Sequence, residues 1–156
     1  MDVYYRPAIE LDAETIITQW ISSTHRHHPY IKRYTLWNAH QESKRREIIE
    51  KLSTNLPQIL IACNPERMSE IYGWCCFTKI NSSIIIDYIY IDKQHRQKGL
   101  ATDLFKEIGV SGKSVLCSDV SKYCIKIEEH YKKNRKPIRI YNVKHLIDEY
   151  VTGGTK

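Results

Sequence analysis

Three runs of β-branched and aromatic residues follow one another in the middle of the chain, and they constrain the fold more than any other feature. They span residues 58–63, 70–78 and 84–91, and each has the length and composition typical of a strand. The sequence Asn-Ser-Ser at 81–83 predicts a turn between the second and the third run. We therefore expect a sheet at the centre of the protein.

Helices are predicted in the sequence before and after these strands. Within residues 12–23, apolar side chains recur at the spacing of one helix face, at Ile16, Ile17, Trp20 and Ile21. The other expected elements are a first strand ending near Pro7, an irregular segment at 24–38, a helix at 39–54 capped by Asn38, a helix at 99–109, a strand at 113–118, a helix at 120–134, a strand at 138–142 and a last helix at 143–150. This order predicts a mixed α and β class.

The length of 156 residues fits one domain, which we expect over residues 1–151, with a loose tail at 152–156. No apolar run is long enough to cross a membrane, and the N-terminal residues lack the basic and apolar blocks of a signal peptide. Five cysteines without a CxxC pair favour a reduced, cytoplasmic setting over a disulfide scaffold or a zinc site. We expect no metal and no membrane partner.

The net charge of +6 is unevenly distributed. Residues 25–51 carry seven Lys or Arg against three Glu, and residues 122–139 carry seven against two. Two basic segments of this kind indicate an anionic partner, either a phosphorylated cofactor or a nucleic acid. The alternative is that they are solvated helix faces with no partner.

The segment from Ile84 to Ile108 carries the clearest chemical signal. An apolar strand runs into a polar turn, Arg96-Gln97-Lys98-Gly99, and a helix begins at once. The first turn of a helix exposes unpaired N–H groups and a partial positive charge, which together bind phosphate. The absence of GxxxxGK[ST] and GxGxxG disfavours a nucleoside triphosphate or a dinucleotide.

Arg96-x-x-Gly99-x-Ala101 resembles the phosphate loop of the GCN5-related N-acetyltransferases (GNATs), and Ile89-Tyr90-Ile91-Asp92 resembles the strand that precedes it in that family. The resemblance is specific over about residues 84–109. It implies a largely antiparallel, twisted central sheet flanked by helices and splayed around an acyl-CoA site. The alternative is an ordinary strand-to-helix connection with an exposed basic turn.

The resemblance also implies how acetyl-CoA, or another acyl-CoA, would be held. Backbone N–H groups of the turn would bind the pyrophosphate, and the exposed backbone of the strand would pair with the pantetheine arm. A strand N–H would polarise the thioester carbonyl, and an amine would attack it directly. The implied cofactor-binding residues are Tyr90, Ile91, Arg96, Gln97, Lys98, Gly99, Leu100, Ala101 and Thr102.

Two residues are candidates for proton transfer. Tyr131 lies in a segment similar to the one whose Tyr protonates the CoA sulfur in the family, although Cys124, Ile127 and Asn134 depart from the flanking pattern. Asp87 stands where family members often have a Glu that acts as a base, and a carboxylate in an apolar strand needs a reason. The alternatives are a half-buried aromatic on a helix face for Tyr131 and an outward-facing side chain for Asp87.

Trp37, Asn38 and His40 are candidates for contact with the acceptor, because the segment between the first two helices lines the acceptor side in GNAT-like folds. The alternative is a helix cap with Trp37 packed on the core. His25, His27 and His28 lack an accompanying carboxylate or Cys pattern that would make a metal site, and we interpret them as polar loop residues.

The leading hypothesis is an acyl-CoA-dependent N-acyltransferase whose acceptor amine is undetermined. The basic segments 25–51 and 122–139, together with some similarity to phage-encoded Mom-type DNA modification proteins, favour a nucleic acid as a subsidiary hypothesis. In the competing hypothesis the protein is a non-catalytic nucleic-acid-binding module. It would contact phosphates through 122–139 and stack bases on Tyr123, Tyr131 and Tyr141.

Overall fold

The computed structural model describes residues 2–27, 37–53, 57–110, 114–118 and 139–142. The elements follow in the order β1 (Tyr4–Pro7), η1 (Glu10–Asp12), α1 (Ala13–His27), α3 (Trp37–Ser53), β2 (Pro57–Cys63), β3 (Ile71–Ile80), β4 (Ser83–Ile91), η2 (Lys93–His95), α4 (Leu100–Glu107), β5 (Ser114–Cys117) and β6 (Arg139–Asn142). The predicted helices at 120–134 and 143–150, the tail at 152–156, and the segment that contains Tyr131 lie outside the described residues.

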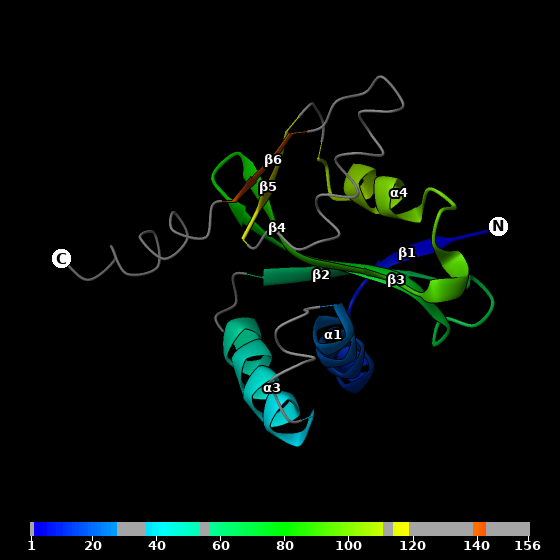
Figure 1. Cartoon of the computed structure of the whole chain (residues 1–156). Coiled ribbons are helices and arrows are strands. Elements are labelled where there is room, and N and C mark those ends of the chain that lie inside the picture. Colours follow the sequence, from blue (N-terminus) through cyan, green and yellow to red (C-terminus); the bar gives the residue numbers. More distant parts are fainter. Residues whose placement is uncertain (1, 28–36, 54–56, 111–113, 119–138, 143–156) are drawn as a thin grey trace.

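Within this part of the chain, six strands form one sheet in the order β1-β2-β3-β4-β5-β6 (Figure 1). The first four strands are antiparallel neighbours, whereas β5 runs parallel to β4 and β6 runs parallel to β5. The expectation of a mixed α and β fold with a largely antiparallel sheet is therefore confirmed. The hairpin between β3 and β4 turns at Asn81, whose φ of 53° lies in the left-handed region that Asn tolerates.

Helices cover both faces of this sheet. In Figure 1, α1 and α3 pack on one face and α4 packs on the other. The stripe Ile16, Ile17, Trp20 and Ile21 of α1 packs with Ile48 of α3 against Trp74 and Cys76 of β3. On the opposite face, Leu100, Leu104 and Phe105 of α4 pack against Cys75 and Phe77. Because β3 is covered on both faces, its residues from Tyr72 to Thr78 are all buried.

A buried ion pair joins β1 to the start of α1. The Arg6 guanidinium donates to both carboxylate oxygens of Asp12, at 2.7 and 2.9 Å, and the N–H of Ile9 donates to the same carboxylate at 2.8 Å. Arg6 holds the pKa of Asp12 below its usual range, and the Ile9 N–H acts in the same direction against the effect of burial. This carboxylate therefore ties β1 to the residues that lead into α1.

The two N-terminal helices differ slightly from their predicted bounds. Helix α1 continues to His27, because Ser23 and Thr24 donate their hydroxyls to the carbonyl of Trp20, at 3.0 and 2.9 Å, and so remain compatible with the helix. Helix α3 begins at Trp37, which places Asn38 inside its first turn and not at its cap. No helix in the described part of the chain is long and apolar enough to span a membrane.

Candidate functional site

The connection from β4 to α4 adopts the strand-turn-helix arrangement expected from the sequence. Strand β4 ends at Ile91, the short helix η2 follows, and α4 begins at Leu100. Two residues of the turn, Gln97 and Gly99, have positive φ, at 63° and 83°. Gly99 is the residue at the N-cap of α4, and its left-handed conformation favours glycine. The chain therefore reverses tightly and presents the first N–H groups of α4 just after the strand ends.

Side chains within the turn fix its shape. Nε of Arg96 donates to the carbonyl of Ile91 at 2.9 Å, which closes the turn onto the end of β4. The carboxylate of Asp92 accepts the N–H of Gln94 at 3.0 Å and lies 3.3 Å from Nδ1 of His95. The His95 ring stacks on Tyr72 of β3 with 4.2 Å between centroids. Arg96, expected as a phosphate ligand, thus also has a structural contact.

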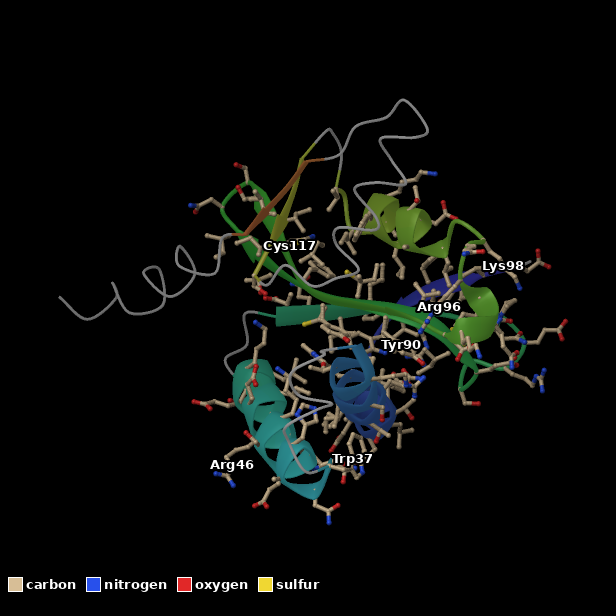
Figure 2. The ribbon with its side chains drawn as sticks, in the orientation of Figure 1. Trp37, Arg46, Tyr90, Arg96, Lys98 and Cys117 are labelled. Atoms are coloured by element: carbon tan, nitrogen blue, oxygen red, sulfur yellow. The ribbon has the colours of Figure 1, made fainter. Side chains whose placement is uncertain are left out.

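The tip of the turn is open to solvent. Gln97, Lys98 and Gly99 are exposed, and Figure 2 shows Arg96 and Lys98 beside the start of α4. A Cβ placed on Gly99 would meet only Oδ2 of Asp103, at 3.9 Å, so space in front of this backbone is available to a ligand. Leu100 is buried, while Ala101 and Thr102 are half-buried, so Leu100 offers a ligand its backbone and not its side chain.

One edge of β4 is only partly covered. Strand β5 pairs with β4 at Ile85 and Ile86, and the N–H of Ser118 donates to the carbonyl of Ile86 at 3.0 Å. In the described residues, this pairing does not extend to residues 87–91, where β4 pairs with β3 alone. The backbone of Tyr90 and Ile91 therefore lies on a strand edge that leads directly to the turn at 96–99.

A β-bulge interrupts β4 where β5 leaves it. The register passes from Cys76 opposite Tyr88 to Phe77 opposite Ile86, so Asp87 is an extra residue on β4. As a result, the consecutive side chains of Asp87 and Tyr88 both project towards the face that carries α1 and α3. The bulge thus marks the point from which the uncovered edge of β4 begins.

Asp87 is buried and held from two sides. Its side chain is 1% exposed, with Oδ1 at 2.8 Å from Nζ of Lys51 on α3. The hydroxyl of Thr78 on β3 donates to Oδ2 at 2.6 Å. An amine acceptor would have to compete with both contacts to give its proton to this carboxylate. The role of Asp87 as a base stays a prediction.

An aromatic cluster lines the α1 face beside the bulge. Trp20 stacks on Tyr88 with 4.8 Å between centroids, and Trp74 stacks on Tyr90 at 5.9 Å. The Tyr88 and Ser23 hydroxyls are 2.6 Å apart. Burial, and then the nearby Asp92 carboxylate, raise the pKa of the Tyr90 phenol, against the opposing effect of Arg96 and Arg26. Tyr90 therefore stays protonated at neutral pH.

The three residues predicted to contact the acceptor lie in the first turn of α3, and they differ in exposure. Trp37 is 39% exposed and Asn38 is exposed, whereas His40 is buried. Asn38 also lines an open hollow between α1 and α3, together with Thr18, Ile21, Gln41, Glu42 and Arg45. Contact with an acceptor stays a prediction for all three residues.

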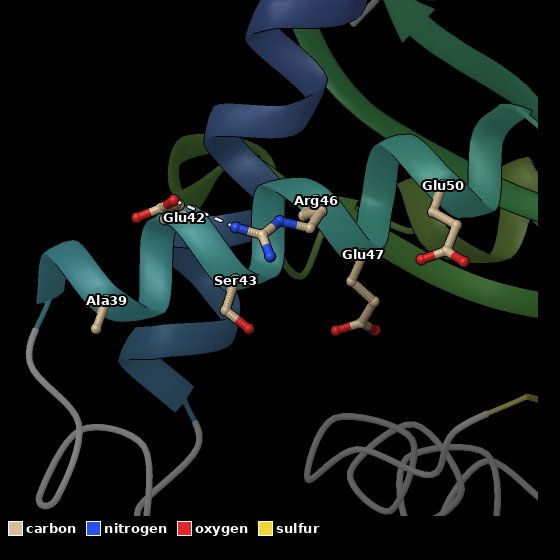
Figure 3. A pocket seen from close by; sticks show the side chains of 6 residues that line it. All are labelled: Ala39, Glu42, Ser43, Arg46, Glu47 and Glu50. Atoms are coloured by element: carbon tan, nitrogen blue, oxygen red, sulfur yellow. Dashed lines mark hydrogen bonds and ion pairs between the residues drawn. The ribbon is translucent and has the colours of Figure 1, made fainter.

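The outer face of α3 carries carboxylates beside its basic residues. A shallow hollow there is lined by Ala39, Glu42, Ser43, Arg46, Glu47 and Glu50, and within it Arg46 pairs with Glu42 (Figure 3). Arg46 lies 3.2 Å from Glu42, Lys44 lies 2.7 Å from Glu47, and Arg45 pairs with Glu14. The basic residues of this helix are therefore locally neutralised, as expected for a solvated helix face. The part of segment 122–139 before Arg139 lies outside the described residues.

Sequence reasoning did not identify Lys51 and Thr78 as neighbours of Asp87. They lie 36 and 9 residues away in the chain, on a different helix and a different strand, and no local spacing connects them. The available signal was indirect: a carboxylate inside an apolar strand requires a cation or hydrogen-bond donors beside it. The described residues contain no group of three or more His, Cys, Asp or Glu that could hold a metal ion.

No protein-family model matches the sequence, and no curated protein is similar to it. Solved structures are similar in fold. A possible acetyltransferase from Clostridium difficile 630 superposes with a TM-score of 0.59 at 15% identity, over 90% of this chain and 94% of that one. A GNAT-family acetyltransferase from Staphylococcus aureus Mu50 gives 0.55 at 18% identity, over 85% and 83%.

A predicted acetyltransferase from Clostridium acetobutylicum, solved with acetyl-CoA, gives a TM-score of 0.50 at 15% identity, over 91% of this chain and 80% of that one. At these identities the likeness concerns the fold. The chain therefore has the fold of the GCN5-related N-acetyltransferases.

Proposed function

We propose that the protein is an acyl-CoA-dependent N-acyltransferase that uses acetyl-CoA and transfers its acetyl group to an amine. The observation that supports this most is the continuity between the edge of β4 at 87–91, which no other described strand covers, and the exposed, glycine-capped N-terminus of α4. Such an edge offers unpaired backbone groups to an extended ligand, and such a helix start offers N–H groups to a phosphate.

The residues present fit an acyl-CoA. The turn at 97–102 would hold the pyrophosphate through backbone N–H groups, with Lys98 exposed beside it and open space in front of Gly99. The backbone of Tyr90 and Ile91 would pair with the amide-rich pantetheine arm as an added strand. Acetyl-CoA, when bound, supplies an activated thioester.

The protein's part in the reaction would be to position the amine, accept its proton and assist the departing thiolate. The aromatic cluster around the buried Trp74 and the half-buried Tyr88 covers the α1 side of β4, and it would exclude water from the reacting end of the arm. Tyr131 is proposed as the group that protonates the thiolate, in keeping with its resemblance to the family's segment.

The experiment compares two glycine variants by calorimetric titration with acetyl-CoA. Gly99→Asp places a Cβ and a negative charge at the start of α4, so affinity should fall by more than tenfold, or above about 1.4 kcal/mol. Gly109→Asp is the matched control, because Gly109 has nearly the same φ, 88° against 83°, at the other end of the same helix. It should bind acetyl-CoA like the parent.

Equal affinity of the parent and Gly99→Asp, with both folded by circular dichroism, would end the acyltransferase proposal. Failure of the parent to bind acetyl-CoA would end it as well. A native mass spectrum of freshly purified protein provides an independent check, because CoA retained through purification adds a defined mass.

A further inference from the structure

We propose that Asp87 is a positioning residue and not the proton acceptor: its contacts with Lys51 and Thr78 hold the β4 bulge that keeps the strand edge open for the acyl end of the cofactor. The inference rests on the proposed function and assigns roles to Lys51 and Thr78 that the sequence did not indicate. It follows from where the three side chains originate and from how little water reaches the carboxylate.

The three side chains tie three separate elements to one point. Lys51 comes from the last turn of α3, Thr78 from β3 and Asp87 from the bulge of β4. Thr78 lies opposite Ile85, just past the position where the register shifts. The contacts therefore hold the extra residue next to Ile85 and Ile86, where β4 is still paired with β5. The residues of β4 from the bulge to Tyr90 are not paired with β5 in the described part of the chain.

The bulge lies where the reacting end of a bound acyl-CoA would be. From Ile91, beside the turn, to Asp87 the strand extends about 13 Å at roughly 3.3 Å per residue. An arm that runs up this edge from a phosphate at the turn thus points towards the bulge. Without the extra residue, β4 would continue in regular register and its side chains beyond Ile86 would exchange faces.

Because the carboxylate is buried, the two charge-removing variants, at Lys51 and at Asp87, should differ in how much they damage the bulge. A role of Asp87 as a base alone would not produce this difference. The Asp87 side chain is 1% exposed, whereas that of Lys51 is 33% exposed. Removing the Lys51 charge leaves a carboxylate that water scarcely reaches, and the bulge must move to solvate it. Removing the Asp87 charge leaves a lysine that water already reaches. Lys51→Met should therefore be more damaging than Asp87→Asn.

The test measures two affinities for each variant by calorimetry: one for acetyl-CoA and one for its 3′-phospho-ADP fragment. The fragment reaches only the turn, so the ratio of the two dissociation constants reports on the strand edge at 87–91. The variants are Lys51→Met, Asp87→Asn, the double variant and Lys51→Arg. Lys44→Met is the control, since Lys44 also lies on α3 and also forms an ion pair, at 2.7 Å, with Glu47.

We expect Lys51→Met to reduce acetyl-CoA affinity at least tenfold while fragment affinity stays within about twofold. Asp87→Asn should lose less, the double variant should recover towards Asp87→Asn, and Lys51→Arg should restore most of the affinity. Lys44→Met should match the parent. Should Lys51→Met fail to fold, Thr78→Val makes the same test from the other carboxylate oxygen.

Three results would overturn the inference. An unchanged affinity ratio in Lys51→Met and Asp87→Asn would leave Asp87 with a purely chemical role. A parallel loss for both ligands would indicate general destabilisation. A double variant no better than Lys51→Met would exclude the ion pair as the cause. The proposed function itself fails if the parent protein does not bind acetyl-CoA, whether or not it binds the fragment. That outcome concerns the parent, so it differs from the three results above, which concern the variants.

Discussion

Gly73 of β3 is the position where a single added methyl group should disturb the site most directly. Gly73 lies opposite Ile91, the last residue of β4. A Cβ at Gly73 would come within 2.7 Å of Cδ1 of Ile91 and 2.8 Å of the carbonyl oxygen of Tyr90. Carbon atoms prefer separations of about 3.5–4.0 Å, so the overlap is close to 1 Å. The Ile91 side chain can rotate away, but the Tyr90 carbonyl belongs to the sheet.

Gly73→Ala should therefore shift the end of β4 and destabilise the fold. Overpacking of this kind costs about 1–3 kcal/mol. For a chain of this length each kcal/mol lowers the melting temperature by roughly 2–4 °C, which gives a fall of about 2–12 °C in scanning calorimetry. Since Tyr90 and Ile91 are also proposed to hold the pantetheine arm, acetyl-CoA affinity should drop about threefold or more, or ~0.7 kcal/mol.

Gly109→Ala separates the two effects. A Cβ at Gly109 would meet only Cδ1 of Ile84, at 3.7 Å, but its φ of 88° makes alanine strained by about 1–2 kcal/mol. This variant should melt earlier yet bind acetyl-CoA like the parent. A parental melting temperature for Gly73→Ala would refute the steric reasoning, and a parental affinity in a destabilised Gly73→Ala would refute the link to the cofactor.

Three further variants test other contacts. The pKa of Asp12 is lowered in the folded protein, so its contribution to stability is complete above the unfolded pKa of about 3.9 and is lost as the pH falls below that value. Asp12→Asn should therefore have a lower melting temperature at pH 7 and should lose less stability than the parent between pH 5 and pH 3. Parallel profiles of melting temperature against pH for the two proteins would contradict this. Ser23→Ala removes the contacts of the Ser23 hydroxyl with Tyr88 and with the Trp20 carbonyl and should cost about 1 kcal/mol in urea unfolding; a parental stability would contradict the role of these contacts. If Tyr131 protonates the thiolate, Tyr131→Phe should slow single-turnover acetyl transfer by about 10²–10⁴ with acetyl-CoA affinity retained, and a full rate would remove it from the mechanism.

The parts of the fold that depend on local pattern could be predicted from the sequence. The stripe from Ile16 to Ile21 gave the buried face of α1, and the three central runs gave β2, β3 and β4 within two residues of their bounds. The turn before α4 was predictable because Gly99 and the polar residues before it have strong local preferences. Which helix covers which face of β3 was not predicted, since it depends on helices from distant parts of the chain.

The charge of α3 shows what a count of charges along the chain leaves out. Residues 25–51 are basic in total, but Arg45 pairs with Glu14 of α1, and Lys51 pairs with Asp87 of β4. Those partners lie outside the segment, so a count of its own charges cannot include them. Whether a basic surface exists depends on tertiary neighbours, and around α3 the structure supplies carboxylates.

The bulge at Asp87 corresponds to a change of phase in the pattern of aliphatic and aromatic residues along β4, which is missed if the strand is assumed to be regular. In a regular strand, residues 85, 87, 89 and 91 would share one face, and each face would mix isoleucine with a polar or aromatic residue. A phase shift between residues 86 and 89 instead places Ile84, Ile86, Ile89 and Ile91 together against α4, and Tyr88 and Tyr90 together against α1. The shifted pattern gathers four isoleucines on the α4 face and both tyrosines on the α1 face, where Ile85 and Asp87 also lie. Asp87 is the residue that has no partner across the ladder to β3. A polar residue at the point where an apolar alternation changes phase therefore indicates a bulge, with a buried partner to be found elsewhere in the chain.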